Sequence, residues 1–101
     1  MSDLNEVVAL KNGSKAPLAA VEMITLVLRR MISGDLDQMQ ALIDFVDCVR
    51  DDKPLSEKSQ KIILSYGLIE AQGVVHDNTR NILLSAAVGE GLMLQLVSPY
   101  A

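Results

Sequence analysis

Hydrophobic and polar positions follow a helical period through the first two-thirds of the chain. Apolar residues recur every three or four positions in three runs, at residues 17–33, 36–51 and 56–66. This spacing places the apolar side chains of each run on one side of a helix. Ser56 is a favourable N-terminal cap for the third run. The pattern therefore predicts three consecutive helices.

Capping residues predict where the second and third helices begin and end. Asp35 precedes the second helix, and its side chain is suited to cap the first-turn amides, with Gln38 three residues later as in a capping box. Gly67 follows the third helix, at the position where a left-handed glycine commonly ends a helix. Leu68, just beyond it, is placed to fold back onto Ile63 as in a Schellman motif.

The first helix, which Pro17 opens and Gly34 ends, has a wide apolar face. Its polar side chains occupy only a narrow strip on a helical wheel. That strip consists of Glu22, Thr25, Arg29 and Ser33. A helix that is apolar over so much of its circumference either lies at the centre of its own domain or is covered by another chain. The second interpretation predicts a homodimer formed through the first helix.

Two apolar segments near the C-terminus favour a β-hairpin. Residues 81–88 and 92–98 are separated only by Gly89-Glu90-Gly91. A three-residue loop with a left-handed glycine is a common hairpin connection. Folding the chain about this turn sets Val88 opposite Leu92, with one wholly apolar face.

The alternative for the same region is a fourth helix, with Asp77 as its N-terminal cap and Gly89 at its end. The fold class is α+β, mainly α: a three-helix bundle followed by a C-terminal β-hairpin, or four helices plus one short strand. At 101 residues the chain is expected to form a single domain, residues 1–101. Residues 1–16 are either flexible or a short strand, with a turn at residues 11–15.

Charge and cysteine content indicate which classes of partner the protein binds and in which cellular compartment it lies. The formal net charge is −4, which is unfavourable for binding phosphate backbones. Cys48 is the only cysteine, which is typical of a reducing compartment. The first residues show no signal-peptide pattern, and no apolar run is long enough to span a membrane. We therefore expect a cytoplasmic protein with neither a nucleic acid nor a membrane as its partner.

Four aspartates form an acidic stripe on the second helix, opposite its apolar face. They are Asp37, Asp44, Asp47 and Asp51. Such a stripe is either the solvated side of a surface helix or a docking face for a basic partner. The sequence leaves both interpretations open.

Side chains suited to catalysis or metal binding are sparse. A hydrolase or transferase needs a nucleophile, a base and a group that orients the base. The chain has one histidine, His76, and one cysteine, Cys48, which is too few for an ordinary zinc site. The aspartates lack the spacing of a calcium loop, and Gly89-Glu90-Gly91 lacks the residues of a phosphate-binding loop. We expect no enzyme activity, no cofactor and no metal.

The end of the third helix resembles the corresponding part of a winged helix-turn-helix domain. The residues that carry this likeness are Ile62-Ile63-Leu64-Ser65-Tyr66-Gly67-Leu68-Ile69-Glu70, followed by Gly73. The likeness covers residues 62–73 by residue pattern and 18–98 by the order of elements. It implies a third helix in the DNA major groove, with Lys58, Gln60 and Lys61 available to read bases. The charges depart from that family, because the second helix bears the acidic stripe and residues 81–101 contain no lysine or arginine.

We therefore expect a small non-catalytic protein-binding module that acts as an adaptor, an inhibitor or a regulator of a larger protein. Winged helices also serve as protein-interaction modules, so the resemblance fits this function as well. The alternative is a winged-helix DNA-binding transcription regulator, dimeric through the first helix. The residues expected to contact the partner are Asp37, Asp44, Asp47, Asp51, Lys58, Lys61, Leu64, Met93, Gln95 and Val97.

Overall fold

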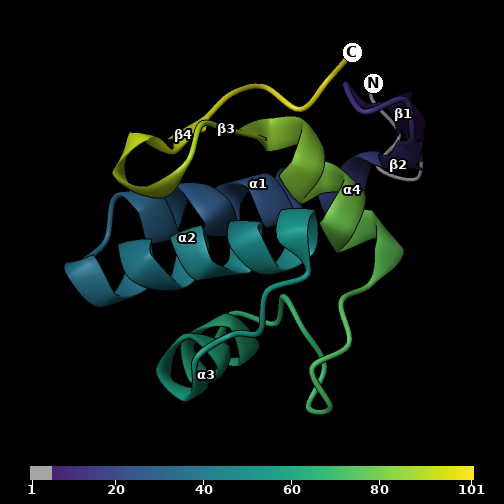
Figure 1. The fold of residues 1–101 in the computed structure, drawn as a ribbon. Coiled ribbons are helices and arrows are strands. Elements are labelled where there is room, and N and C mark those ends of the chain that lie inside the picture. Colours follow the sequence, from purple (N-terminus) through teal and green to yellow (C-terminus); the bar gives the residue numbers. More distant parts are fainter. Residues whose placement is uncertain (1–5) are drawn as a thin grey trace.

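Within residues 6–101, four helices and two pairs of short antiparallel strands make up the fold (Figure 1). The computed structural model describes residues 6–101, so the prediction for the first five residues lies outside the described range. The helices are α1 (Leu18–Ile32), α2 (Leu36–Asp51), α3 (Glu57–Ser65) and α4 (Asp77–Ala86). The strands are β1 (Val7–Ala9), β2 (Lys15–Pro17), β3 (Ala87–Val88) and β4 (Gln95–Leu96), with one 3₁₀ turn, η1 (Gly91–Met93), between the last two. The predicted α+β, mainly α class is confirmed.

The predicted capping residues start α2 and α3. The Asp35 carboxylate accepts a hydrogen bond from the backbone amide of Gln38 at 2.9 Å. The Ser56 hydroxyl likewise accepts one from the amide of Ser59 at 3.1 Å. Each side chain satisfies an amide that has no partner within its own helix. Both predicted starts are confirmed.

A Schellman motif ends α3, as the sequence predicts. Gly67 has a φ of +76°, in the left-handed region that favours glycine. The amide of Leu68 donates to the carbonyl of Ile63 at 3.3 Å, and the amide of Gly67 donates to the carbonyl of Leu64 at 3.0 Å. The turn directs Leu68 into the core, where it is buried.

The C-terminal region follows the helical alternative up to residue 86. The predicted strand at residues 81–88 is extended only in its last two residues, because α4 occupies the rest. The side chains that α4 buries include Thr79, Ile82, Leu83 and Ala86, which are three or four residues apart. A strand would point Ile82 and Leu83 to opposite faces, whereas a helix buries both. The four-helix alternative is therefore correct for this segment, but its limits differ from those predicted. Asp77 is the first residue of α4 and not its cap, and α4 ends at Ala86, before Gly89.

A short hairpin does lie at the predicted place, but in a different register. Ala87 pairs with Leu96, and Val88 pairs with Gln95. The predicted pairing of Val88 with Leu92 is wrong, because η1 and two glycines lengthen the loop between the strands. The hairpin therefore has two pairs of residues in place of a long ladder.

Backbone contacts at Gly89 and the side chain of Arg50 hold this hairpin. Gly89 has a φ of +85°, and a Cβ at this position would clash with the carbonyl oxygen of Met93. The Arg50 guanidinium, from the last turn of α2, donates to the carbonyls of Gly89 at 2.6 Å and Ala87 at 2.5 Å. These bonds join the end of α2 to the loop and to β3.

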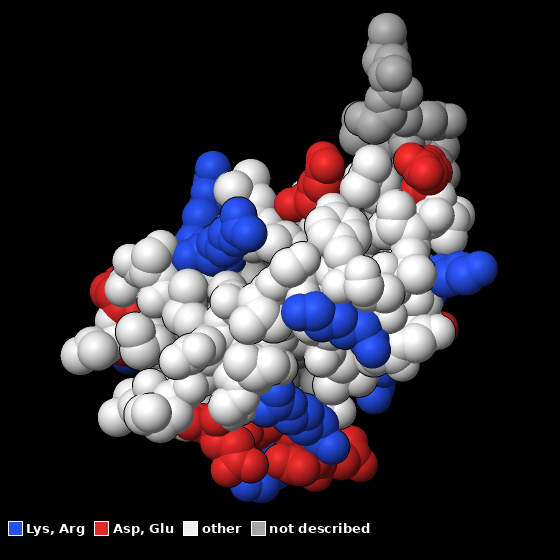
Figure 2. All heavy atoms as spheres, turned by 90° about the horizontal axis from the view of Figure 1, so that it is seen from above, with Lys and Arg blue, Asp and Glu red and all other residues white. Residues whose placement is uncertain are grey.

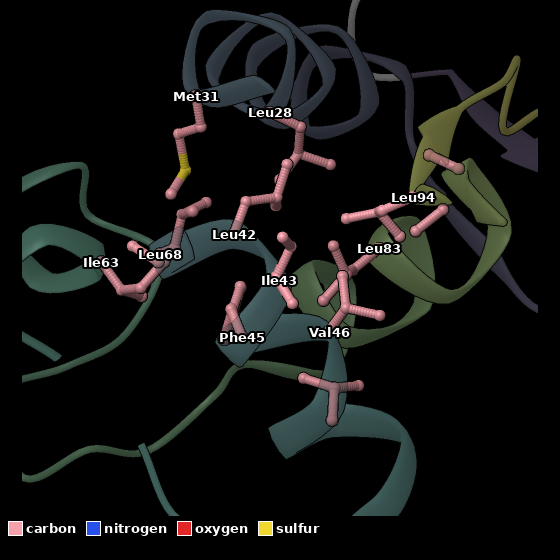
Figure 3. Packing of buried hydrophobic residues seen from close by; sticks show 14 of the residues in the cluster. Leu28, Met31, Leu42, Ile43, Phe45, Val46, Ile63, Leu68, Leu83 and Leu94 are labelled. Atoms are coloured by element: carbon pink, nitrogen blue, oxygen red, sulfur yellow. The ribbon is translucent and has the colours of Figure 1, made fainter. Parts of the chain in front are cut away.

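α2 is the central helix, and α1, α3 and α4 pack around it (Figure 3). Its buried residues are Ala41, Leu42, Ile43, Phe45, Val46 and Val49. Such closely spaced positions lie on more than one side of a helix, so several neighbours are needed to cover them. α1, which the sequence offers as a central helix, instead covers one side of α2 and keeps an exposed face.

β1 and β2 form a second hairpin, and the C-terminal residues run alongside β1 (Figure 1). Leu10 forms an antiparallel bridge with Tyr100, and the amide of Lys11 donates to the carbonyl of Pro99 at 2.9 Å. Residues 7–17 therefore contain two short strands, and a short strand is one of the two predicted alternatives for this region. The small core beneath this hairpin consists of Leu10, Ala16, Val21 and Ile82.

Replacing Gly89 by alanine should lower the free energy of unfolding by roughly 2–4 kcal/mol, because the new Cβ would meet the Met93 carbonyl in a left-handed backbone. Gly91→Ala is the matched control. Gly91 is also left-handed, at a φ of +53°, but a Cβ there meets open space, so the loss should be only about 1 kcal/mol. Urea denaturation measures both variants. Equal losses would contradict the close contact at Gly89.

Candidate functional site

The lysines predicted to meet a partner form ion pairs within the chain. Lys58 Nζ lies 2.8 Å from Oδ1 of Asp37. This hydrogen bond, together with the charge of the carboxylate, raises the pKa of Lys58 above its ordinary value. Lys61 Nζ lies 3.8 Å from Oε1 of Glu57, one turn earlier on α3. The exposed face of α3 therefore carries balanced charge and is less basic than its lysines alone indicate.

The acidic stripe of α2 is partly covered by α3. Asp44 is half-buried, and its carboxylate accepts hydrogen bonds from the Ser59 hydroxyl at 2.5 Å and the Gln40 amide at 2.9 Å. Because Ser59 is only 4% exposed, Asp44 binds α3 to α2 and is not free to bind a partner. Asp47 is half-buried, and Asp51 is exposed at the end of α2. The four aspartates do not form one continuous acidic surface.

The remaining predicted contact residues lie on opposite sides of α2, with α3 on one side and the β3–β4 hairpin on the other (Figure 1). Leu64 on α3 is exposed, as are Met93 and Gln95 near the hairpin. Val97 is half-buried, and its amide donates to the carbonyl of Ala86 at 2.7 Å. The structure therefore does not bring the predicted residues together into a single site.

Cys48 and His76 lie in separate surroundings. Burial and the charge of Asp52 raise the pKa of the Cys48 thiol, and Arg80 acts in the opposite direction. A raised pKa keeps a thiol protonated and poorly nucleophilic near neutral pH. His76 is in an exposed loop, with Nε2 3.0 Å from Oε1 of Glu70. Within residues 6–101, no three histidine, cysteine or acidic side chains gather as a metal site would require.

A hollow between α1 and the C-terminal segment is a feature that the sequence does not predict. Its volume is about 320 Å³. The residues that line it are Glu22, Thr25, Leu26, Arg29, Ser98, Pro99 and Tyr100. The bridge between Leu10 and Tyr100 holds the C-terminal segment against β1 and so positions the second wall. We call this feature the α1 hollow.

A stripe of exposed side chains on α1 lies beside the α1 hollow. Its members are Glu22, Met23, Leu26, Arg29 and Arg30, and we call it the α1 outer face. Met23 is 66% exposed and Leu26 52% exposed. Glu22 lies toward the N-terminal end of the stripe, and the two arginines lie toward the C-terminal end. An apolar centre with charges at its margin is typical of a protein-contact surface.

The side of the molecule seen in Figure 2 carries large uncharged areas. Basic side chains lie among these areas, and acidic ones lie mainly toward the edges. The hydroxyl oxygen of Thr25, in the wall of the α1 hollow, is buried and has no hydrogen-bond partner within residues 6–101. The α1 outer face and the α1 hollow therefore form the candidate site.

The sequence contains a signal for the outer face but not for the hollow. Met23 and Leu26 lie near the narrow polar strip of the first helix. When the opposite side of α1 is buried, these two side chains are therefore exposed to solvent along with the strip. The hollow depends on Tyr100 lying beside Thr25, and no local pattern brings together residues so far apart in the chain.

Comparison with known protein families, curated proteins and solved structures finds no match for this chain. The winged-helix resemblance therefore stays a prediction, and the candidate site rests on its geometry. None of the helices in residues 6–101 combines the length and the apolar character that crossing a membrane requires.

Asp44→Ala should lower the free energy of unfolding by about 1–3 kcal/mol, because the buried Ser59 hydroxyl would lose its acceptor. Asp47→Ala is the matched control. It removes a carboxylate from the same helix, and Asp47 accepts no side-chain hydrogen bond within residues 6–101. Its effect should stay within about 0.5 kcal/mol. Thermal and urea denaturation give both values, and equal losses would show that the contact between Asp44 and Ser59 does not stabilise the fold.

The Cys48 thiol should react with iodoacetamide at mildly alkaline pH several-fold more slowly in the folded chain than in the urea-unfolded chain. Burial raises its pKa and also restricts access of the reagent. Asp52→Asn should increase the folded-state rate, because it removes a negative charge that raises the same pKa. Mass spectrometry follows the alkylation. A folded-state rate equal to the unfolded one would contradict this description of Cys48.

Proposed function

We propose that this chain is a non-catalytic protein-binding module that acts in the cytoplasm as an adaptor, an inhibitor or a regulator of a larger protein. The α1 outer face and the α1 hollow form its contact surface. The observation that carries the proposal is that Leu26 belongs to both the α1 outer face and the α1 hollow. One partner therefore covers the exposed stripe and enters the hollow at the same time. The lone cysteine, Cys48, supports a reducing compartment.

The exposed apolar area on α1 gives association a driving force. Complete burial of a leucine or methionine side chain contributes about 1.5–3 kcal/mol. Scaled by their exposed fractions, Met23 and Leu26 together offer roughly 2–4 kcal/mol to a partner that covers them. Ordering of the two molecules offsets part of this gain. The matching partner surface has an apolar centre, a basic group near Glu22 and an acidic group near Arg30.

The charges do not favour the DNA-binding alternative. Lys58 and Lys61, the cations that the winged-helix resemblance would present to DNA, already pair with acidic side chains of the chain itself. Contact with phosphates would break these pairs and leave Asp37 and Glu57 at the interface, where they repel the nucleic acid. A protein surface imposes no such cost.

Photo-crosslinking tests the proposed surface. A benzophenone amino acid at position 26 should give a discrete adduct with a protein in the cells that make this chain. The same amino acid at position 74 is the matched control, because Val74 is also 52% exposed but lies in the loop between α3 and α4. Position 74 should give no discrete adduct. Equal yields at both positions, or no adduct at position 26, would refute the proposal.

A further inference from the structure

We infer that the partner on the α1 outer face is a second copy of this chain, paired through antiparallel α1 helices whose two-fold axis passes beside Leu26. The inference rests on the proposed function, since it names the occupant of the same surface. The order of charged and apolar residues along α1 supports it. Their arrangement on either side of Leu26 complements itself when one helix is reversed.

A two-fold axis beside Leu26 fixes which residues face each other. In an antiparallel pair of helices, the residue four positions before Leu26 lies at the same height as the residue four positions after it in the second copy. Each edge of the α1 outer face meets the same edge of the second copy, so Glu22 lies beside Arg29 and Arg30 of the second copy, and Met23 lies beside Arg30 of the second copy. Leu26 faces its own counterpart. This contact is isologous, as in most dimers of identical chains.

The charges select the antiparallel direction. Antiparallel pairing brings Glu22 and Arg30 together twice, once at each end of the contact. Parallel pairing would instead place Glu22 beside Glu22 and Arg30 beside Arg30, and like charges in an interface are unfavourable. Within residues 6–101, Glu22, Arg29 and Arg30 take part in no ion pair, so all three are available to a second copy.

The net charge of −4 does not prevent this association. The α1 outer face itself carries two arginines and one glutamate, so the acidic excess lies elsewhere on the molecule. Charges that are separated by more than about 8 Å are largely screened at physiological ionic strength.

The shape of α1 also suits close contact between two copies. Ala19 on α1 and Ser33, the residue that follows α1, lie on the same side as Leu26, seven residues before it and seven after it. Antiparallel pairing places one small residue opposite the other, which lets the two helices approach closely. Met23 then packs against the aliphatic part of Arg30 of the second copy. The α1 hollow leaves space beside Leu26 for side chains of the second copy.

Pairing through α1 has a consequence for the proposed function. The second copy covers the contact surface itself, so a larger protein binds the α1 outer face in competition with dimer formation.

Charge exchange tests the inference by sedimentation velocity, from low micromolar to millimolar concentration. The native chain should show a concentration-dependent equilibrium between monomer and dimer. Glu22→Arg and Arg30→Glu should each weaken the dimer by roughly tenfold or more in Kd, because each creates like-charge pairs. Mixing these two variants should restore the dimer, since every position 22 then faces an opposite charge at position 30. The double variant should also restore it.

Matched variants separate this effect from a change in net charge. Glu90→Arg and Lys53→Glu make the same charge changes at exposed positions away from α1, and they should leave the dimer unchanged. Leu26→Glu should abolish the dimer, because it places two carboxylates at the two-fold axis. Leu26 is half exposed, so the variant should fold, which circular dichroism verifies.

Each remaining outcome decides the inference. A native chain that stays monomeric at millimolar concentration overturns it, and so does a dimer that persists unchanged in Leu26→Glu and in both single charge variants. A monomer that still gives a position-26 adduct with a different protein overturns self-association and leaves the proposed function standing. A monomer without that adduct overturns both.

Discussion

The need to cover the wide apolar side of α2 determines the arrangement of the other elements. Residues 41–49 of α2 include buried side chains at adjacent positions, among them Ala41, Leu42 and Ile43. No single helix covers such a surface, so α1, α3 and α4 each contribute one face. Each of these outer helices buries one face against the core and leaves another exposed. For α1, whose apolar circumference is the widest, the unburied remainder includes Met23 and Leu26.

Polar side chains of α2 bind the elements that cover it. Asp44 reaches the buried Ser59 on α3, and Arg50 reaches two carbonyls of the β3–β4 hairpin. Hydrogen bonds to charged groups are roughly twice as strong as those between neutral groups. The central helix therefore holds two of its neighbours through ionised side chains as well as through apolar contact. α1 packs against the same helix mainly through Leu28 and Met31, which are fully buried.

Local signals in the sequence are sufficient for the helix limits, whereas the site depends on distant contacts. Asp35, Ser56 and Gly67 act within one turn of their own position, so their roles follow from spacing alone. Leu83 and Leu84 fit both an alternating and a helical pattern. Burial of Leu83 together with Ile82 against other elements decides between the two patterns.

The same distinction explains why the acidic stripe and the central helix differ from expectation. From the sequence alone, Asp44 is expected to be solvated. In the fold it is covered by Ser59, which lies fifteen positions later in the chain. A wide apolar face on the first helix indicates burial but does not say how much of it the rest of the chain covers. The packing of the neighbouring helices determines how much of that face is buried. It leaves part of α1 exposed and places α2 at the centre.

The bridge between Leu10 and Tyr100 joins residues that are almost the whole chain apart, and this has a consequence for folding. Contacts between such distant residues are entropically costly until the intervening chain is ordered. We therefore expect the second wall of the α1 hollow to form late, after the helices have packed around α2. A partly folded chain exposes Leu26 without offering the hollow beside it. A partner that contacts both Leu26 and the α1 hollow would therefore distinguish molecules that have completed folding from those that have not.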